Sequence, residues 1–95
     1  MKRYAETQNE LIDRVKLALN TESFYRVGKV LGISERTLAK ADKNQHFLTD
    51  YNICLLCDVG GLDALKTLAC IRQIEANEKG NDKVAEFWQK QTNAA

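Results

Sequence analysis

The chain has 95 residues, no proline and 44% hydrophobic residues, a composition that suits one small helical domain with a modest core. Its 14 basic and 13 acidic residues nearly balance, which excludes a polycation that binds other molecules through overall charge alone. No apolar run approaches the roughly 20 residues needed to cross a bilayer, and the start MKRYAETQNE lacks a signal-peptide apolar region. We therefore expect a cytoplasmic protein with no membrane partner.

The first helix is predicted to follow a polar start. Residues 1–9 are expected to be a flexible N-terminal segment, in which Lys2 and Arg3 either form a basic arm or stay mobile. Apolar residues at helical spacing then predict a scaffold helix over 10–19. These residues are Leu11, Ile12, Val15, Ala18 and Leu19. The turn-forming Asn20 and Thr21 end it.

Residues 23–43 hold two short helical patterns on either side of one glycine. Gly32 ends the first pattern, because glycine adopts a positive φ without steric cost and lets the chain reverse within about three residues. Ser23 or Thr21 is expected to cap this first helix by accepting a hydrogen bond from a backbone N–H. Its predicted apolar stripe consists of Val27, Val30 and Leu31.

The second helix of this unit is short and polar on its outer side. Ile33 is predicted to be a buried plug and Ser34 an N-cap, while Leu38 and Ala41 point inward. The residues left outside are Glu35, Arg36, Ala39, Lys40 and Lys43. Residues 23–43 carry five basic and two acidic side chains, a local net charge of +3, although the whole chain carries only +1. Such a helix suits the major groove of DNA, and the alternative is an ordinary helical hairpin with a solvated basic face.

Two more helices are predicted in the middle of the chain. After a polar link over 44–47, a helix begins at Thr49 or Asp50 and ends at the glycines 60–61. It is apolar on most sides, so we expect a core pillar carrying Tyr51, Ile53, Cys54, Leu55, Leu56 and Cys57. A fifth helix over 62–76 has an apolar stripe wider than one core contact requires, which favours contact with a second subunit over a central position.

A charged break over 77–82 precedes a short final helix. Val84, Phe87, Trp88 and Gln91 are predicted to share one face of it. The two aromatic rings either fold back on the domain or lock a homodimer. The dimerisation residues that we predict are Ile71, Ile74, Val84, Phe87 and Trp88. Together these patterns predict an all-α fold with a flexible segment over 1–9, a DNA-binding domain over 10–76 and a dimerising C-terminal helix within 77–95.

The sequence offers little catalytic or metal-binding chemistry. Cys54 and Cys57 form a C-x-x-C pair that Cys70 and His46 could in principle complete as a zinc site. The pair falls inside a predicted helix rather than on a turn, so we expect no metal, no cofactor and no redox dithiol. No Ser/His/Asp set, carboxylate pair or phosphate-cradling glycine loop can be assembled, so neither an enzyme nor a small-molecule substrate is expected. Three cysteines, an odd number, fit reduced thiols.

One spacing connects this chain to a known family. Gly28, Gly32 and Leu38 follow the helix-turn-helix pattern of a small residue, a glycine four residues later and an aliphatic residue six further on. Val27, Leu31 and Ile33 occupy the accompanying buried positions. The chain resembles phage repressor-type regulators, and the run from LIDRVKLAL through VGKVLGISERTLAK to EFWQKQ is similar to small helix-turn-helix proteins of filamentous phages and prophages. Gly28 replaces the usual Ala, and Ala39 and Ala41 stand where many relatives have Ser and a bulky residue.

The resemblance implies a compact bundle of five to six helices with a repressor-type helix-turn-helix. It also implies a DNA-binding transcriptional regulator in a bacterial host, a repressor that binds a palindromic operator as a dimer. The residues expected to contact double-stranded DNA are Ser34, Glu35, Arg36, Thr37, Ala39, Lys40, Lys43, Asn44 and Ser23. Two alternatives remain open: an antirepressor-like interaction module that has lost DNA binding, and the antitoxin of a toxin–antitoxin pair.

Overall fold

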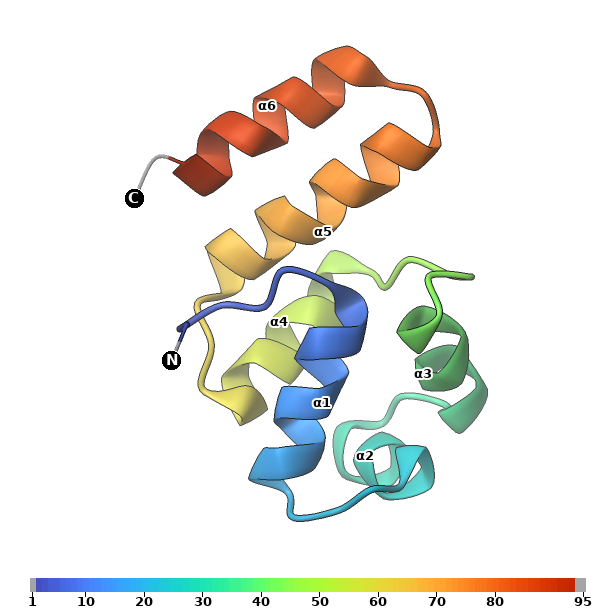
Figure 1. Ribbon diagram of the computed structural model, residues 1–95. Coiled ribbons are helices and arrows are strands. Elements are labelled where there is room, and N and C mark those ends of the chain that lie inside the picture. Colours follow the sequence, from blue (N-terminus) through green and yellow to red (C-terminus); the bar gives the residue numbers. More distant parts are fainter. Residues whose placement is uncertain (1, 94–95) are drawn as a thin grey trace.

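The computed structural model describes residues 2–93, and these residues form six α-helices and no strand (Figure 1). The helices are α1 (Gln8–Ala18), α2 (Phe24–Leu31), α3 (Glu35–Asp42), α4 (Asp50–Gly60), α5 (Ala64–Glu78) and α6 (Asp82–Asn93). The predicted all-α fold is confirmed. Met1, predicted to begin a flexible segment, and Ala94 and Ala95, at the end of the predicted dimerising unit, lie outside the described residues.

Side-chain caps begin the first five helices. In each case a side-chain oxygen accepts a hydrogen bond from the backbone N–H three residues later, which satisfies one of the unpaired donors at a helix start. The caps are Thr7, Ser23, Ser34, Thr49 and Asp63. Gly32 and Gly61 end α2 and α4 with φ of 73° and 67°, as glycine C-caps commonly do. Local capping signals therefore fix most of the helix boundaries.

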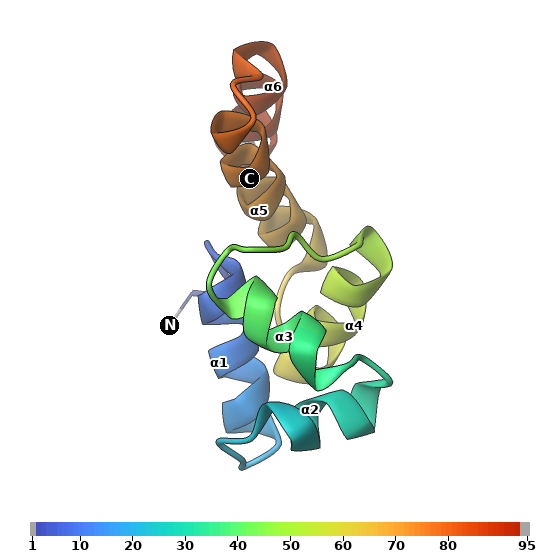
Figure 2. The ribbon, with the colours of Figure 1, turned by 90° about the vertical axis from the view of Figure 1, so that its right-hand side faces the viewer.

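Helices α1 to α4 form the body of the molecule, and α5 and α6 form a hairpin that rises from it (Figures 1 and 2). Helix α5 packs on α4, whereas α6 packs antiparallel to α5, on the side away from the body. The α2 helix lies at the opposite end of the long axis, in a molecule measuring 37 × 26 × 19 Å. The two ends of the molecule are thus built from different parts of the chain.

The core lies between α1, α2, α3, α4 and the middle of α5. Its largest fully buried apolar side chains are Leu11, Ile12, Val15, Val27, Leu38, Leu48, Ile53, Leu56 and Ile71. Ala18, at the end of α1, is exposed although it was expected in the apolar stripe of that helix. Three further apolar residues expected in stripes are exposed on α2 and α4: Val30 by 52%, Tyr51 by 71%, and Cys54. They occupy sides of α2 and α4 that no neighbouring helix covers, so the core pillar prediction holds only for one side of α4, with Ile53, Leu56 and Cys57.

The N-terminal segment packs on the fold instead of extending from it. Ala5 is fully buried, and its N–H donates to Thr67 Oγ1 at 3.0 Å. The Asp63 N–H donates to the Arg3 carbonyl, which ties the same segment to the start of α5. Helix α1 begins at Gln8, two residues before the predicted start. Within the flexible segment predicted over 1–9, Arg3, Ala5 and Gln8 are therefore bonded to or packed on the rest of the fold.

The C-terminal hairpin also differs in detail from its prediction. Helix α5 continues to Glu78, so the boundary placed at 77 falls inside a helix. The turn holds Gly80 at φ 71°. In α6, Ala85 is buried against α5 and Thr92 Oγ1 lies 3.9 Å from Cys70 Sγ, so the side of α6 that includes them faces α5. Phe87 lies off that side and is 52% exposed.

Candidate nucleic-acid interface

The turn between α2 and α3 is closed by one carbonyl group. The Gly28 carbonyl accepts hydrogen bonds from the Gly32 N–H at 2.7 Å and from the Ile33 N–H at 3.0 Å. A Cβ atom added at Gly28 would lie 2.2 Å from the Ile33 carbonyl oxygen, closer than any real contact. Glycine is therefore required at position 28 for this approach. Ile33 itself is 6% exposed, so it is the buried plug that the sequence predicts.

Helix α3 presents the polar face that the sequence predicts. Leu38 and Ala41 are fully buried beneath it. The exposed residues along α3 and its ends are Ser34, Glu35, Arg36, Lys40 and Lys43, while Thr37 and Ala39 are partly exposed. Across residues 2–93, the ion pairs that form involve none of the charged side chains of this face. Its cationic groups are available to an anion from solution.

Two of the serines predicted to contact DNA already use their hydroxyl groups in capping, at the starts of α3 and α2. Ser34 Oγ accepts a hydrogen bond from the Thr37 N–H at 3.0 Å and donates one to Thr37 Oγ1 at 2.7 Å. Ser23, at the start of α2, accepts from the Arg26 N–H at 3.2 Å. These residues therefore have a structural role that is independent of any contact with DNA.

The carboxyl end of α3 is held from below by Gln8, a residue whose role was not predicted from the sequence. Gln8 is 1% exposed, and its Nε2 donates to the Ala41 carbonyl at 3.0 Å and to the His46 carbonyl at 2.8 Å. Its Oε1 accepts from the Leu48 N–H at 2.8 Å. The spacing of Gln8 from Leu11 was the available signal, since it places Gln8 on the buried side of α1.

Asn44 belongs to the same support. Its backbone has a φ of 55°, its N–H donates to the Ala41 carbonyl at 3.0 Å, and its Oδ1 lies 3.4 Å from Gln8 Nε2. Asn tolerates this left-handed conformation better than most residues. Its expected contact with a DNA phosphate stays a prediction.

A cleft of about 420 Å³ separates α2 from the start of α3. Its walls include Tyr25 and Lys29, which lie on one side of α2, and Glu35 of α3. Tyr25 is 56% exposed, and Lys29 Nζ lies 3.3 Å from its hydroxyl oxygen. Lys29 contributes to the local net charge of +3 over residues 23–43, but its place beside α3, like that of Tyr25, was not predicted from the sequence.

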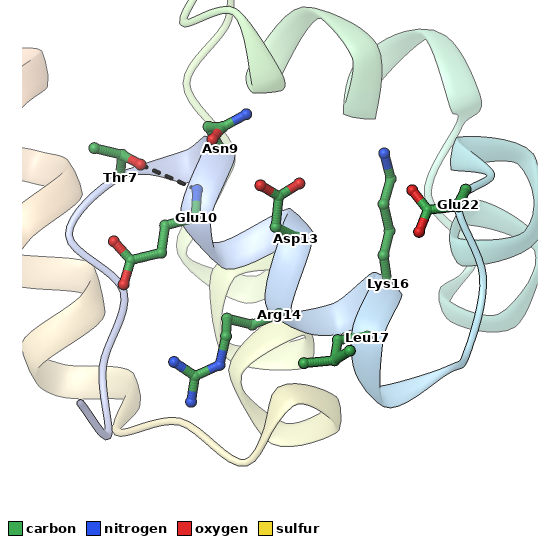
Figure 3. Close-up of a pocket in the computed structure, with 8 residues that line it drawn as sticks. All are labelled: Thr7, Asn9, Glu10, Asp13, Arg14, Lys16, Leu17 and Glu22. Carbon is green, nitrogen blue, oxygen red and sulfur yellow. Dashed lines mark hydrogen bonds between the residues drawn. The ribbon is translucent and has the colours of Figure 1, made fainter. Parts of the chain in front are cut away.

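A second open pocket, of about 610 Å³, runs along α1 (Figure 3). The side chains of Asp13 and Lys16 point to one side of α1, whereas those of Glu10 and Arg14 point to another. Lys16 Nζ lies 3.8 Å from the centre of the Phe24 ring. The carboxylates of Glu10 and Asp13 thus diverge and do not form the converging pair that acid–base catalysis uses.

The cysteines differ in exposure. Cys54 is exposed on α4, while Cys57 and Cys70 are buried. Burial raises the pKa of the Cys57 thiol to about 11, and it also raises the pKa of the Cys70 thiol. In the described part of the chain, no group of three or more His, Cys, Asp or Glu residues is arranged to hold a metal ion.

The residues predicted for dimerisation do not share one surface. Ile71 is fully buried in the core, so its assignment to a subunit interface is wrong. Ile74 is partly buried in a groove between α5 and the N-terminal segment, and Trp88 is partly buried as well. Val84 and Phe87 are 39% and 52% exposed on α6.

Among residues 2–93, no helix has the length and apolar character to span a bilayer.

The fold and this face define a class: a small all-helical protein that exposes the polar side of a short helix, α3, after a tight glycine turn. The chain belongs to the family of the "Uncharacterized protein Gp-c" of Pseudoalteromonas phage PM2, with which it shares 32% identity over 85 residues, 88% of this chain and 92% of the relative. No family model matches the chain, and no solved structure matches it.

Proposed function

We propose that this protein is a sequence-specific DNA-binding regulator of transcription, a phage or prophage repressor that places α3 in the major groove. The observation that carries the proposal is the division of α3 into two sides. Its apolar side, with Leu38 and Ala41, is fully buried, and its polar side is exposed. A helix anchored in this way from behind can enter a groove without losing its contacts with the body.

The exposed residues of α3 supply chemistry that reads base edges. Arg36 can donate two hydrogen bonds to the O6 and N7 atoms of a guanine, and Glu35 can accept one from the amino group of a cytosine. Lys40 is one turn further along and reaches a base or a phosphate. Lys43 and the exposed N–H groups at the start of α2, after Ser23, would fix the DNA backbone.

A dimer is part of the same proposal. One α3 covers only a few base pairs, whereas two copies related by a two-fold axis place their recognition helices about 34 Å apart on a palindrome. The exposed apolar side chains Val84 and Phe87 on α6 favour the hairpin as the surface of contact. Repression follows if the bound operator overlaps a promoter.

The test begins with a footprint of the purified protein on DNA flanking its own gene. Affinity should fall steeply with salt, because each neutralised phosphate releases a condensed counterion. The double variant Arg36→Ala/Lys40→Ala should lose its retention on nonspecific duplex DNA. Lys83→Ala/Lys90→Ala removes the same charge from exposed positions of α6 and should be retained like the wild type.

The two double variants also separate the proposal from its rival. An interaction module that masks another regulator would use the same fold without binding DNA, and the low net charge of +1 is the observation that favours it. In that case the wild type would not be retained on DNA at low salt. If both double variants lost retention equally, binding would depend on total charge, and the role assigned to α3 would be wrong.

A further inference from the structure

An arginine of α5, Arg72, donates hydrogen bonds to three residues and helps to join this helix to the rest of the fold. The Arg72 side chain is only 15% exposed. Its Nη2 donates to the Leu48 carbonyl and to Asp50 Oδ1, both at 2.7 Å, and its Nε donates to the same Asp50 oxygen at 3.1 Å. Its Nη1 donates to Glu75 Oε1 at 3.2 Å. Arg72 thus ties α5 to the end of the α3–α4 link and to the first residue of α4.

Leu48 continues this connection toward α3. Its carbonyl accepts from Arg72, while its N–H donates to Gln8 Oε1 at 2.8 Å. Gln8 Nε2 then donates to the carbonyl of Ala41, in the last turn of α3, at 3.0 Å. Leu48 and Gln8 are each 1% exposed. An unbroken series of hydrogen bonds, sheltered from water at Leu48 and Gln8, therefore runs from α5 to the end of α3.

The residues between α3 and α4 depend on this series for their position. The link over 43–49 contains no helix, and it crosses below α5 in Figure 2. Side chains from α1 and α5 satisfy its backbone groups at His46 and Leu48. Lys43, which the proposed function places against the DNA backbone, begins the link. The placement of α5 thus bears directly on the placement of the DNA-facing end of α3.

We infer that Arg72 is a positioning residue, which fixes the orientation of α3 relative to the α5–α6 hairpin and so selects the spacing between the two half-sites of an operator. The inference rests on the proposed function and deepens it. The hairpin sets where the second subunit lies, and α3 sets where each half-site lies. A rigid connection between them translates into one preferred distance along the DNA.

Arginine suits this role better than other cations. Its planar fork reaches a carbonyl and a carboxylate at the same time. A lysine supplies a single point of charge and cannot reproduce both bonds. Loss of the guanidinium leaves the Leu48 carbonyl without its partner in a largely buried position, and the link is then free to shift.

The experiment compares Arg72→Gln with Lys79→Gln. Lys79 lies on the same helix and also pairs with Glu75, at 3.2 Å, but it is 69% exposed and makes no bond to the link. The probes are duplexes that carry two copies of the footprinted half-site, with the distance between their centres changed in steps of one base pair. A duplex with a single half-site measures the intrinsic affinity of α3.

We expect the wild type and Lys79→Gln to prefer one spacing by about tenfold over duplexes that differ by two base pairs, a difference that gel-shift titration resolves. Arg72→Gln should reduce this preference to about threefold or less, while its affinity for the single half-site changes by less than about twofold. Arg72→Lys should lie between the two. If Arg72→Gln does not fold, the spacing preference of Arg72→Lys is compared with those of the wild type and Lys79→Gln instead.

Two results would overturn the inference. One is an unchanged spacing preference in Arg72→Gln, and the other is equal weakening on every duplex, which describes a merely structural role. Failure of the wild type to bind any duplex is a different result, because it removes the proposed function itself. In that case amide hydrogen exchange, measured without DNA, still tests whether Arg72 holds the link over 43–49 in place. Arg72→Gln should speed exchange at Asn44, Gln45 and Leu48, and Lys79→Gln should not. Unchanged rates at these amides would also overturn the inference.

Discussion

Helices α3 and α6 are both amphipathic, yet only α6 leaves large apolar side chains exposed among its polar ones. In α3 the apolar residues Leu38 and Ala41 are fully buried and the exposed side is polar. In α6 only Ala85 is buried, and Phe87 remains 52% exposed. The apolar side of α3 is therefore fully covered within one chain. In contrast, α6 leaves apolar surface that a second protein surface could cover.

The largest expected difference between the two helices concerns folding stability. Leu38→Ala should lower the free energy of unfolding by about 3 kcal/mol, because truncating a fully buried leucine removes apolar contacts and leaves a cavity. Phe87→Ala should cost less than about 1 kcal/mol in the monomer, since Phe87 is already 52% exposed. Urea denaturation at low protein concentration measures both. Equal costs would mean that α6 is as deeply anchored as α3.

A second comparison concerns two glycines within helices, Gly28 in α2 and Gly60 in α4. Gly28→Ala should cost about 2 kcal/mol, because the new Cβ meets the Ile33 carbonyl oxygen at 2.2 Å and the turn must open. Gly60→Ala is the matched control. Its new Cβ would have neighbours no closer than 3.6 Å, and alanine is a better helix former, so its stability should be unchanged or higher. Greater stability of Gly28→Ala would show that the turn is looser than described.

The hairpin can be tested through association. In the proposed dimer, Phe87→Ser should raise the dissociation constant by about tenfold or more, because an aromatic side chain at the centre of an interface often contributes about 2 kcal/mol. Sedimentation equilibrium over a range of concentrations measures it. Tyr51→Ser removes a 71% exposed aromatic ring from α4 and should leave association unchanged. A dimer weakened by Tyr51→Ser instead would move the interface from the hairpin to the body.

The smallest expected effect is a pH dependence within the body. Burial holds the pKa of the Cys57 thiol at about 11, compared with 9.0 for the ordinary thiol. Above pH 9 the unfolded chain loses this proton first, so the free energy of unfolding should decline as the pH rises from 9 toward 11. Cys57→Ala should show a shallower decline than the wild type. Cys54→Ala, which removes an exposed thiol from the same helix, should retain the wild-type slope.

Local signals in the sequence were sufficient to predict most of the helices. Ser23, Ser34 and Thr49 cap helices through bonds that reach only three residues along the chain, so they can be predicted without knowledge of the fold. Gly32 and Gly61 end helices for an equally local reason. The outward side of α3 was predictable for the same reason, because helical spacing from Leu38 determines it.

Long-range contacts account for what the sequence did not reveal. The burial of Ala5 depends on Thr67, 62 residues away, and no local pattern contains that information. Periodicity placed Ile71 in an apolar stripe but could not say which neighbour covers it. The bond from Arg72 to Leu48 likewise joins residues that are separate in sequence and unremarkable in type.

Because the three thiols differ in burial, a single cysteine can be labelled selectively with a fluorophore. A maleimide dye applied near neutral pH should attach to Cys54 and spare Cys57 and Cys70, whose thiols are buried and hold their protons more tightly. One fluorophore per chain is thereby obtained without mutagenesis. Energy transfer between a donor-labelled and an acceptor-labelled copy would then report how far apart two bodies stand on a shared ligand.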